Sequence, residues 1–251
     1  MLSAPLEPVL GFLEKHHARL EVIDFRLHEL EFPGYKLMPY DYLEYARAEL
    51  DLNTVSSKIN CVAHLKRAVE CELDTILYLL GLRAPKRNFP AKMEFVRAAG
   101  LLSNRSLETL NRYRNKAEHD YDAPDGADLD LYFDLAETFV LALEGYIFML
   151  KESPGIALGF HDYSVPYIGV MQEPRLAVSV ETKDPRIIFE LRDEGERCEI
   201  IASGKDFLFY GEALGVLLLL VRSTSLISLE YVIAQLRGTR KHGTSKGKVG
   251  G

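Results

Sequence analysis

Apolar side chains recur at steps of three and four over residues 6–30, which is the period of an amphipathic helix. The pattern predicts one long helix, and Pro33 and Gly34 are expected to end it because these residues interrupt helices. The stripe spans roughly three heptads, so it suits either a dimer seam or packing against the chain's own helices, and the second is more common. The stripe consists of Leu6, Val9, Leu13, His16, Leu20, Ile23, Leu27 and Leu30.

A second and a third helix are expected next, each bounded by local signals. Asp41 is predicted to cap the second helix, with Glu44 completing a reciprocal capping box. Asn53 or Thr54 starts the third helix, which is longer and stops at Gly81. Its inward positions are predicted to be Val55, Ile59, Val62, Leu65, Val69, Leu73, Ile76, Leu77 and Leu80.

The chain up to residue 155 predicts more helices of the same kind. A short helix is expected over residues 92–99, followed by one over residues 106–121 that Ser106 can cap. Residues 129–150 are apolar around most of the helical circumference, which predicts the central helix of a bundle.

Beyond residue 155 the period changes from helical to alternating. Residues 176–180, 187–191 and 198–201 are typical of strands separated by short turns, and they predict an antiparallel meander. Two helices are expected to follow, over residues 206–221 and 225–236.

These elements predict an α+β protein that is mainly α, with a helical bundle followed by a small antiparallel sheet and its packed helices. The expected parts are an N-terminal amphipathic helix over residues 1–38, the bundle over 39–155 and the small α+β domain over 156–237. Residues 238–251 are rich in glycine and lysine, and we expect them to form a flexible basic tail.

The composition excludes several classes of protein. With 47% apolar residues the chain can bury a substantial core. Its longest apolar run, residues 214–221, is far shorter than the ~20 residues that span a bilayer, and residues 1–13 lack the pattern expected of a signal peptide. We therefore expect a cytoplasmic protein with no membrane partner. The cysteines and histidines lack the spacing of a disulfide framework or a metal site, so no metal and no cofactor is predicted.

The charge is unevenly distributed along the chain. The formal net charge is -7, yet residues 58–119 hold 12 basic and 6 acidic side chains, which gives this segment +6. A polyanion responds to such a local field more than to the net charge. A solvated helix face would give the same count. Charge alone therefore does not decide between a surface that binds a polyanion and an ordinary solvated surface.

The positive segment ends in a motif. Residues 111–121 read Asn-Arg-Tyr-Arg-Asn-Lys-Ala-Glu-His-Asp-Tyr, in which Arg114, Asn115, His119 and Tyr121 have the spacing R-N-x-x-x-H-x-Y. This spacing resembles the signature of the HEPN superfamily, and the resemblance covers about residues 40–150.

The resemblance implies a fold and an activity. HEPN proteins are compact helical bundles, and many are metal-independent ribonucleases that dimerise to build one active site. Some are toxins or antiviral effectors. In toxins paired with a nucleotidyltransferase antitoxin, the tyrosine that corresponds to Tyr121 is modified to silence the toxin. The resemblance thus implies RNA as substrate, a homodimer, and an antitoxin or other protein as a further partner.

The residue types of the motif suit RNA cleavage without a metal. His119 titrates near neutrality and can accept or donate a proton, while Arg114 can stabilise the charge that develops on the phosphorane. Asn115 lies four residues before His119, so it can orient the imidazole, and the carboxylate of Glu118 would raise the pKa of that imidazole. Arg114 and His119 are about 140° apart on an ideal helix, so they converge on one phosphate only if the helix is distorted or a second protomer contributes.

Other residues are candidates for binding RNA. The resemblance places the helix over residues 54–80 along the same groove as the motif, although a polar stripe on a helix is usually just a wet surface. The basic connection over residues 83–95 is expected to project its side chains, with Phe89 either stacking on a base or closing the edge of the core. The candidate RNA-binding residues are His64, Arg67, Lys86, Arg87, Arg112 and Lys116.

The function expected from these observations is a metal-independent endoribonuclease of HEPN type that leaves 2',3'-cyclic phosphate ends. Its catalytic residues would be Arg114, His119 and Asn115, supported by Tyr121 and Glu118. Two alternatives are a non-cleaving HEPN module that senses RNA or a nucleotide, and a structural interaction protein.

Overall fold

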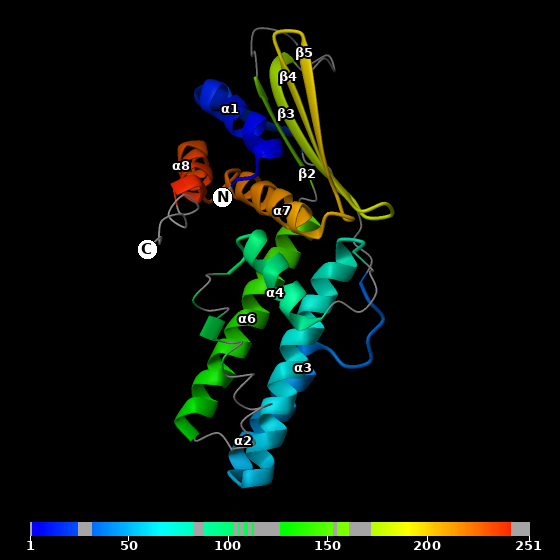
Figure 1. Ribbon diagram of the computed structural model, residues 1–251, viewed down its shortest axis with the longest axis vertical. Coiled ribbons are helices and arrows are strands. Elements are labelled where there is room, and N and C mark those ends of the chain that lie inside the picture. The colour runs from blue at the N-terminus through cyan, green and yellow to red at the C-terminus, as the bar shows by residue number, and fades with distance from the viewer. Residues whose placement is uncertain are drawn as a thin grey trace, which may run out of the picture. The chain divides into compact units, whose positions relative to one another are not determined.

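The computed structural model describes residues 2–24, 32–82, 88–102, 105, 108–109, 112, 126–152, 155–160 and 172–241. The chain divides into two compact units (Figure 1). The helical unit is Leu30–Phe148, and the sheet unit combines Met1–Glu29 with Met149–Gly251. The predicted α+β class with mainly helical content is confirmed, because a single antiparallel sheet accompanies the helices of the described residues.

The helical unit is built around a hairpin of α2 (Pro39–Leu52) and α3 (Val55–Leu79). Pro39 is the first residue of α2, where a proline costs no helical hydrogen bond. The carboxylate of Asp41 accepts a hydrogen bond from the backbone N–H of Met38 at 2.7 Å. Asp41 therefore closes the first turn from inside the helix, and the prediction that it is the capping residue is wrong.

The start and the stop predicted for α3 are confirmed. Thr54 Oγ1 accepts from the N–H of Ser57 at 3.1 Å, and Ser57 Oγ accepts from the N–H of Thr54 at 2.9 Å. Gly81 follows the helix with φ of 72°, a conformation that favours glycine. Most of the predicted inward positions are buried, but Val55 and Ile59 are 66% and 55% exposed because the tip of the hairpin reaches solvent.

The next described helix is α4 (Phe89–Ala98), which starts earlier than predicted. The side chain of Asn88 caps it by accepting a hydrogen bond from the N–H of Ala91 at 3.0 Å. Pro90 lies in the first turn and is tolerated there, so it does not break the helix. Phe89 is only 6% exposed, which excludes base stacking and supports the alternative that it closes the core edge.

The long helix α6 spans Gly126–Glu152. Leu129, Val140 and Leu143 are fully buried, as its apolar character predicts. Leu131 and Phe148, in contrast, are exposed, the second to 64%. The prediction of a central helix buried on most of its circumference is therefore wrong, since one face of α6 carries apolar residues in solvent.

The sheet unit begins with α1 (Glu7–His16), which follows the short helix η1 (Ala4–Leu6) and precedes η2 (His17–Arg19). The chain then turns into β1 (Glu21–Asp24), so the prediction of one helix over residues 6–30 is wrong beyond His16. The reason is a pairing that the periodicity does not reveal. Val22, a β-branched residue that favours strands, lies opposite Leu158 of β2.

The sheet has five strands in the order β1-β2-β3-β4-β5, and all neighbouring pairs are antiparallel. β2 (Gly155–Phe160) and β1 extend the predicted meander. The three predicted strands are confirmed as β3 (Gln172–Glu181), β4 (Arg186–Asp193) and β5 (Glu196–Ser203). Burial alternates along β4, which leaves one face of the sheet towards the core and the other towards solvent.

Helices cover the core face of this sheet. α7 (Phe207–Arg222) contacts β2, β4 and β5, and α1 contacts β3 and β4 (Figure 1). The predicted helix over residues 206–221 is confirmed, with Asp206 accepting from the N–H of Phe209 at 3.1 Å as its cap. α8 (Leu229–Lys241) starts later than predicted and continues past Gly238, so the expected tail is helical up to Lys241.

Among the described residues, every helix is too short or too polar to cross a membrane.

Candidate functional site

The motif stretch falls mostly outside the described residues. This applies to Arg114, Asn115, Glu118, His119 and Tyr121, and also to the candidate RNA-binding residues Lys86, Arg87 and Lys116. Before the motif the structure describes residues 88–102 and four further positions up to Arg112, and after it the description resumes at Gly126.

The segment leading into the motif has helical backbone at each described position. These positions are Arg105, Glu108, Thr109 and Arg112. Thr109 Oγ1 donates a hydrogen bond to the carbonyl of Arg105 at 2.8 Å, the four-residue step of a helix. Ser106, which the sequence predicts as the cap of this helix, lies outside the described residues. Arg112 is exposed.

His64 lies in an aromatic cluster between α2 and α3. Its ring centroid is 5.5 Å from that of Tyr45 and 6.5 Å from that of Tyr42, and Tyr42 and Tyr45 meet edge to face. Nδ1 of His64 is buried, with no hydrogen-bond partner in the described structure. A buried N–H without an acceptor is costly, so Nδ1 is better suited to be the unprotonated ring nitrogen.

The remainder of the predicted polar stripe on α3 mostly contacts neighbouring segments. The amide of Asn60 reaches Glu49 of α2, the thiol of Cys71 contacts the carbonyl of Leu37, and Asp74 forms an ion pair with Lys92. Lys92 is buried by this contact and does not project from the surface as predicted. Arg67 is the exception, since it is exposed and has no ion-pair partner among the described residues.

A buried carboxyl group lies in the interior of the helical unit. Glu72 of α3 is 2% exposed, and its Oε1 has no hydrogen-bond partner in the described structure. Burial raises the pKa of Glu72 to about 7, with a smaller contribution from the charge of Glu144. The hydroxyl of Tyr40 donates to Glu144 at 2.8 Å, and the pKa of Tyr40 rises to about 12 through burial and this bond.

Glu72 can therefore exchange a proton near neutral pH, but its burial keeps it away from a large substrate. The sequence offered a signal for it that the prediction did not use. Glu72 falls on the apolar stripe of α3, three residues after Val69 and four before Ile76. The tyrosines around His64 gave no such signal, because their proximity to α3 depends on how the hairpin closes.

The cysteines do not form a site in the described structure. Cys61, Cys71 and Cys198 are free, and burial raises the pKa of both Cys61 and Cys71 to about 11. These two thiols are thus protonated at neutral pH and unreactive. The described residues contain no cluster of acidic, histidine or cysteine side chains that could hold a metal ion.

No protein-family model, curated protein or solved structure matches the chain.

Proposed function

We propose that the protein is a metal-independent endoribonuclease of HEPN type that acts as a homodimer. The observation that carries the proposal is the R-N-x-x-x-H-x-Y spacing at Arg114, Asn115, His119 and Tyr121. It is supported by the position of this motif between α4 and α6, in a unit whose described elements are all helices.

In this proposal each residue of the motif has a separate task. His119 transfers protons to and from the ribose and leaving-group oxygens, and Arg114 stabilises the charge on the phosphorane. Asn115 orients the imidazole, the carboxylate of Glu118 raises the pKa of that imidazole, and Tyr121 hydrogen-bonds the phosphate or packs at the dimer seam. Because Arg114 and His119 are five residues apart, a second protomer supplies the groups that one helix cannot direct to the same phosphate.

RNA would reach this site along the basic segment that precedes it. Residues 58–119 hold 12 basic and 6 acidic side chains, a net +6 in a chain of -7. Arg67 and Arg112 are exposed in this segment, which also contains His64 with its contacts to Tyr42 and Tyr45. We further propose that the protein serves as a toxin or antiviral effector, with an antitoxin or another protein as its regulator.

The test is cleavage of RNA in EDTA by the full chain. Arg114→Ala and His119→Ala are expected to lower the rate at least about 100-fold, because each removes a group that acts in the transition state. Size-exclusion chromatography should show that both variants remain dimers.

Matched controls are Arg222→Ala and His17→Ala, which change the same residue types outside both the motif and the basic segment. Both should cleave at the rate of the unsubstituted protein. Full activity in both motif variants would sink the proposal. RNA affinity that falls steeply with salt, without cleavage by the unsubstituted protein, would favour the non-cleaving RNA-binding module instead.

A further inference from the structure

The register of the sheet places three arginines side by side. Arg175 of β3 lies directly opposite Arg192 of β4, which lies directly opposite Arg197 of β5. Residues directly opposite each other in antiparallel strands project from the same face, with Cβ atoms about 5 Å apart. We call these three residues the arginine row.

The arginine row lies on the face of the sheet that points away from α1 and α7. Its neighbours along β3 and β4, Leu176 and Leu191, are buried on the core face. Arg192 and Arg197 are exposed, and Arg175 is partly exposed. The row is therefore accessible from solvent at Arg192 of β4 and Arg197 of the edge strand β5, whereas Nε of Arg175 is buried.

Like charges directly opposite on neighbouring strands are destabilising, so the row needs compensation. Arg197 has it, because its guanidinium lies 3.0 Å from the carboxylate of Glu199 and 3.8 Å from that of Glu190. Arg192 has no ion-pair partner within the described part of the chain. Glu190 and Glu199 thus compensate Arg197, and Arg192 at the centre of the row is available to an anion.

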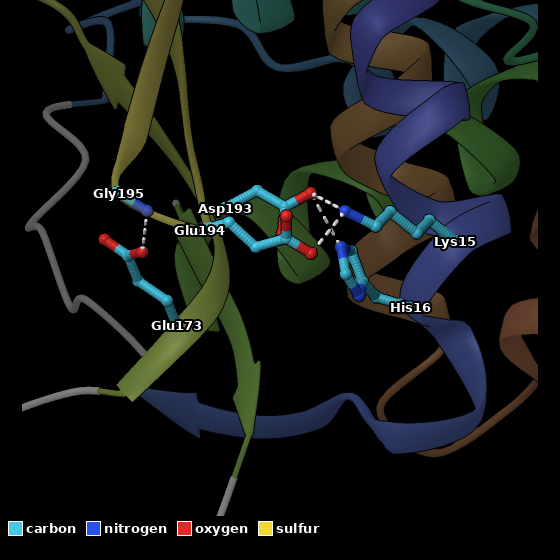
Figure 2. A network of polar contacts seen from close by, with 6 residues as sticks. All are labelled: Lys15, His16, Glu173, Asp193, Glu194 and Gly195. Atoms are coloured by element: carbon cyan, nitrogen blue, oxygen red, sulfur yellow. Dashed lines mark hydrogen bonds and ion pairs between the residues drawn. The ribbon is translucent and has the colours of Figure 1, made fainter.

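Two sets of contacts hold the end of the sheet that carries the row (Figure 2). At the tip of the β4–β5 hairpin, the N–H of Gly195 donates to the carboxylate of Glu173 at 2.6 Å, which ties the tip to the start of β3. On the core face, Asp193 accepts from Lys15 at 2.7 Å and lies 2.9 Å from Nε2 of His16, both in α1. Each arginine is one or two residues from one of these contacts, which therefore hold the backbone that carries the row.

We propose that the arginine row binds the phosphate groups of a ligand, either a free nucleotide or the phosphodiester backbone of RNA. The planar donors of arginine match phosphate oxygens in pairs. Strands about 4.8 Å apart spread three such groups over about 10 Å, which suits a ligand with more than one phosphate. The site goes beyond the proposed ribonuclease function, since it lies in the sheet unit and requires no cleavage.

Binding is tested on the full chain with two probes, a fluorescein-labelled oligouridylate followed by anisotropy and ATP followed by calorimetry. His119→Ala serves as the background so that any cleavage activity leaves the RNA intact. Arg192→Gln is expected to weaken the affinity for the probe that occupies the row roughly five- to tenfold. If that probe is RNA, the slope of log affinity against log salt concentration should also fall by about one. Arg192→Lys should give a smaller loss, because lysine keeps the charge but not the paired donors.

The matched control is Arg222→Gln, which removes an arginine of the same unit that has no ion-pair partner among the described residues. It should bind both probes as the background does. Displacement of RNA by ATP would identify a nucleotide site, and loss of RNA binding without ATP competition would identify a backbone site.

The proposal is overturned if the background protein binds neither probe. It is also overturned if Arg192→Gln and the double variant Arg192→Gln/Arg197→Gln, both folded by circular dichroism, bind the probes as tightly as Arg222→Gln. Neither result depends on whether the unsubstituted protein cleaves RNA, so failure here is distinct from failure of the proposed activity.

Discussion

The helical unit and the sheet unit differ in how far along the chain their contacts reach. The helical unit is one continuous stretch, Leu30–Phe148, and its central hairpin joins helices that follow each other directly. The sheet unit needs both ends of the chain, because Val22 of β1 pairs with Leu158 of β2. Local signals therefore specify most of the first unit, whereas the second depends on pairings between segments that are distant in sequence.

The two units also treat charge differently. The helical unit buries Glu72, whose Oε1 finds no partner among the described residues, inside its helices. The sheet unit instead pairs the buried His16 with the carboxylate of Asp193 and keeps Arg192 and Arg197 exposed. We therefore expect a change of pH to alter mainly the stability of the helical unit. A substitution that disturbs the backbone should alter mainly the stability of the sheet unit.

The largest expected effect comes from Glu72→Gln. Folding raises the pKa of Glu72 from 4.5 to about 7, so the folded protein binds this proton more tightly than the unfolded chain. The resulting stability is fully present below pH 4.5, declines as pH rises to about 7 and is absent above that. The charged carboxyl costs on the order of 3 kcal/mol above pH 7, and glutamine should recover much of it.

Urea unfolding of both proteins between pH 5 and 8 measures this effect. The gain of the variant should grow with pH and reach its maximum above pH 7. Glu44→Gln, an exposed change on α2, should alter the stability by less than about 0.5 kcal/mol. A gain that is the same at pH 5 and pH 8 would contradict the burial of a titrating carboxyl.

A smaller effect is expected from Gly155→Ala at the start of β2. A Cβ at this position would lie 2.7 Å from the carbonyl oxygen of Val178 in β3, so the backbone of the sheet must shift. The expected loss of stability is about 1–3 kcal/mol. Hydrogen exchange should accelerate in β2 and β3 before it does in α3.

The smallest effect, and the matched control, is Gly145→Ala in α6 of the helical unit. Nothing lies within 4 Å of a Cβ added there, and alanine favours a helix more than glycine does. This variant should gain roughly 0.5–1 kcal/mol in thermal or urea unfolding. Equal losses of stability in Gly145→Ala and Gly155→Ala would contradict this comparison. They would mean that an added Cβ is tolerated no better in the helical unit than between the closely packed strands of the sheet unit.

The same distinction explains which parts of the fold could be predicted from sequence. The cap at Thr54, the stop at Gly81 and strands β3 to β5 were predicted correctly because each depends on a few neighbouring residues. The helix over residues 6–30 was predicted wrongly because the stripe keeps its helical spacing to Leu30, although α1 ends at His16. Only the partner strand β2 selects β1 beyond that point.

The candidate sites followed the same rule. A motif can be recognised from its spacing along the chain, so Arg114 and His119 were identified as candidates directly, and their roles stay predictions. The contacts of His64 with Tyr45 and the alignment of Arg192 with its neighbours could not be predicted, because they require the pairing of α2 with α3 and the register of the sheet.

The ends of the RNA fragments test the central claim, metal-independent cleavage by the motif, most directly. The full chain is incubated with RNA in EDTA, and the fragments are analysed by mass spectrometry. The proposal predicts 5' fragments that end in 2',3'-cyclic phosphate and that disappear with His119→Ala. An intact substrate, or fragments with 3'-hydroxyl ends that form only when Mg²⁺ is added, would contradict it.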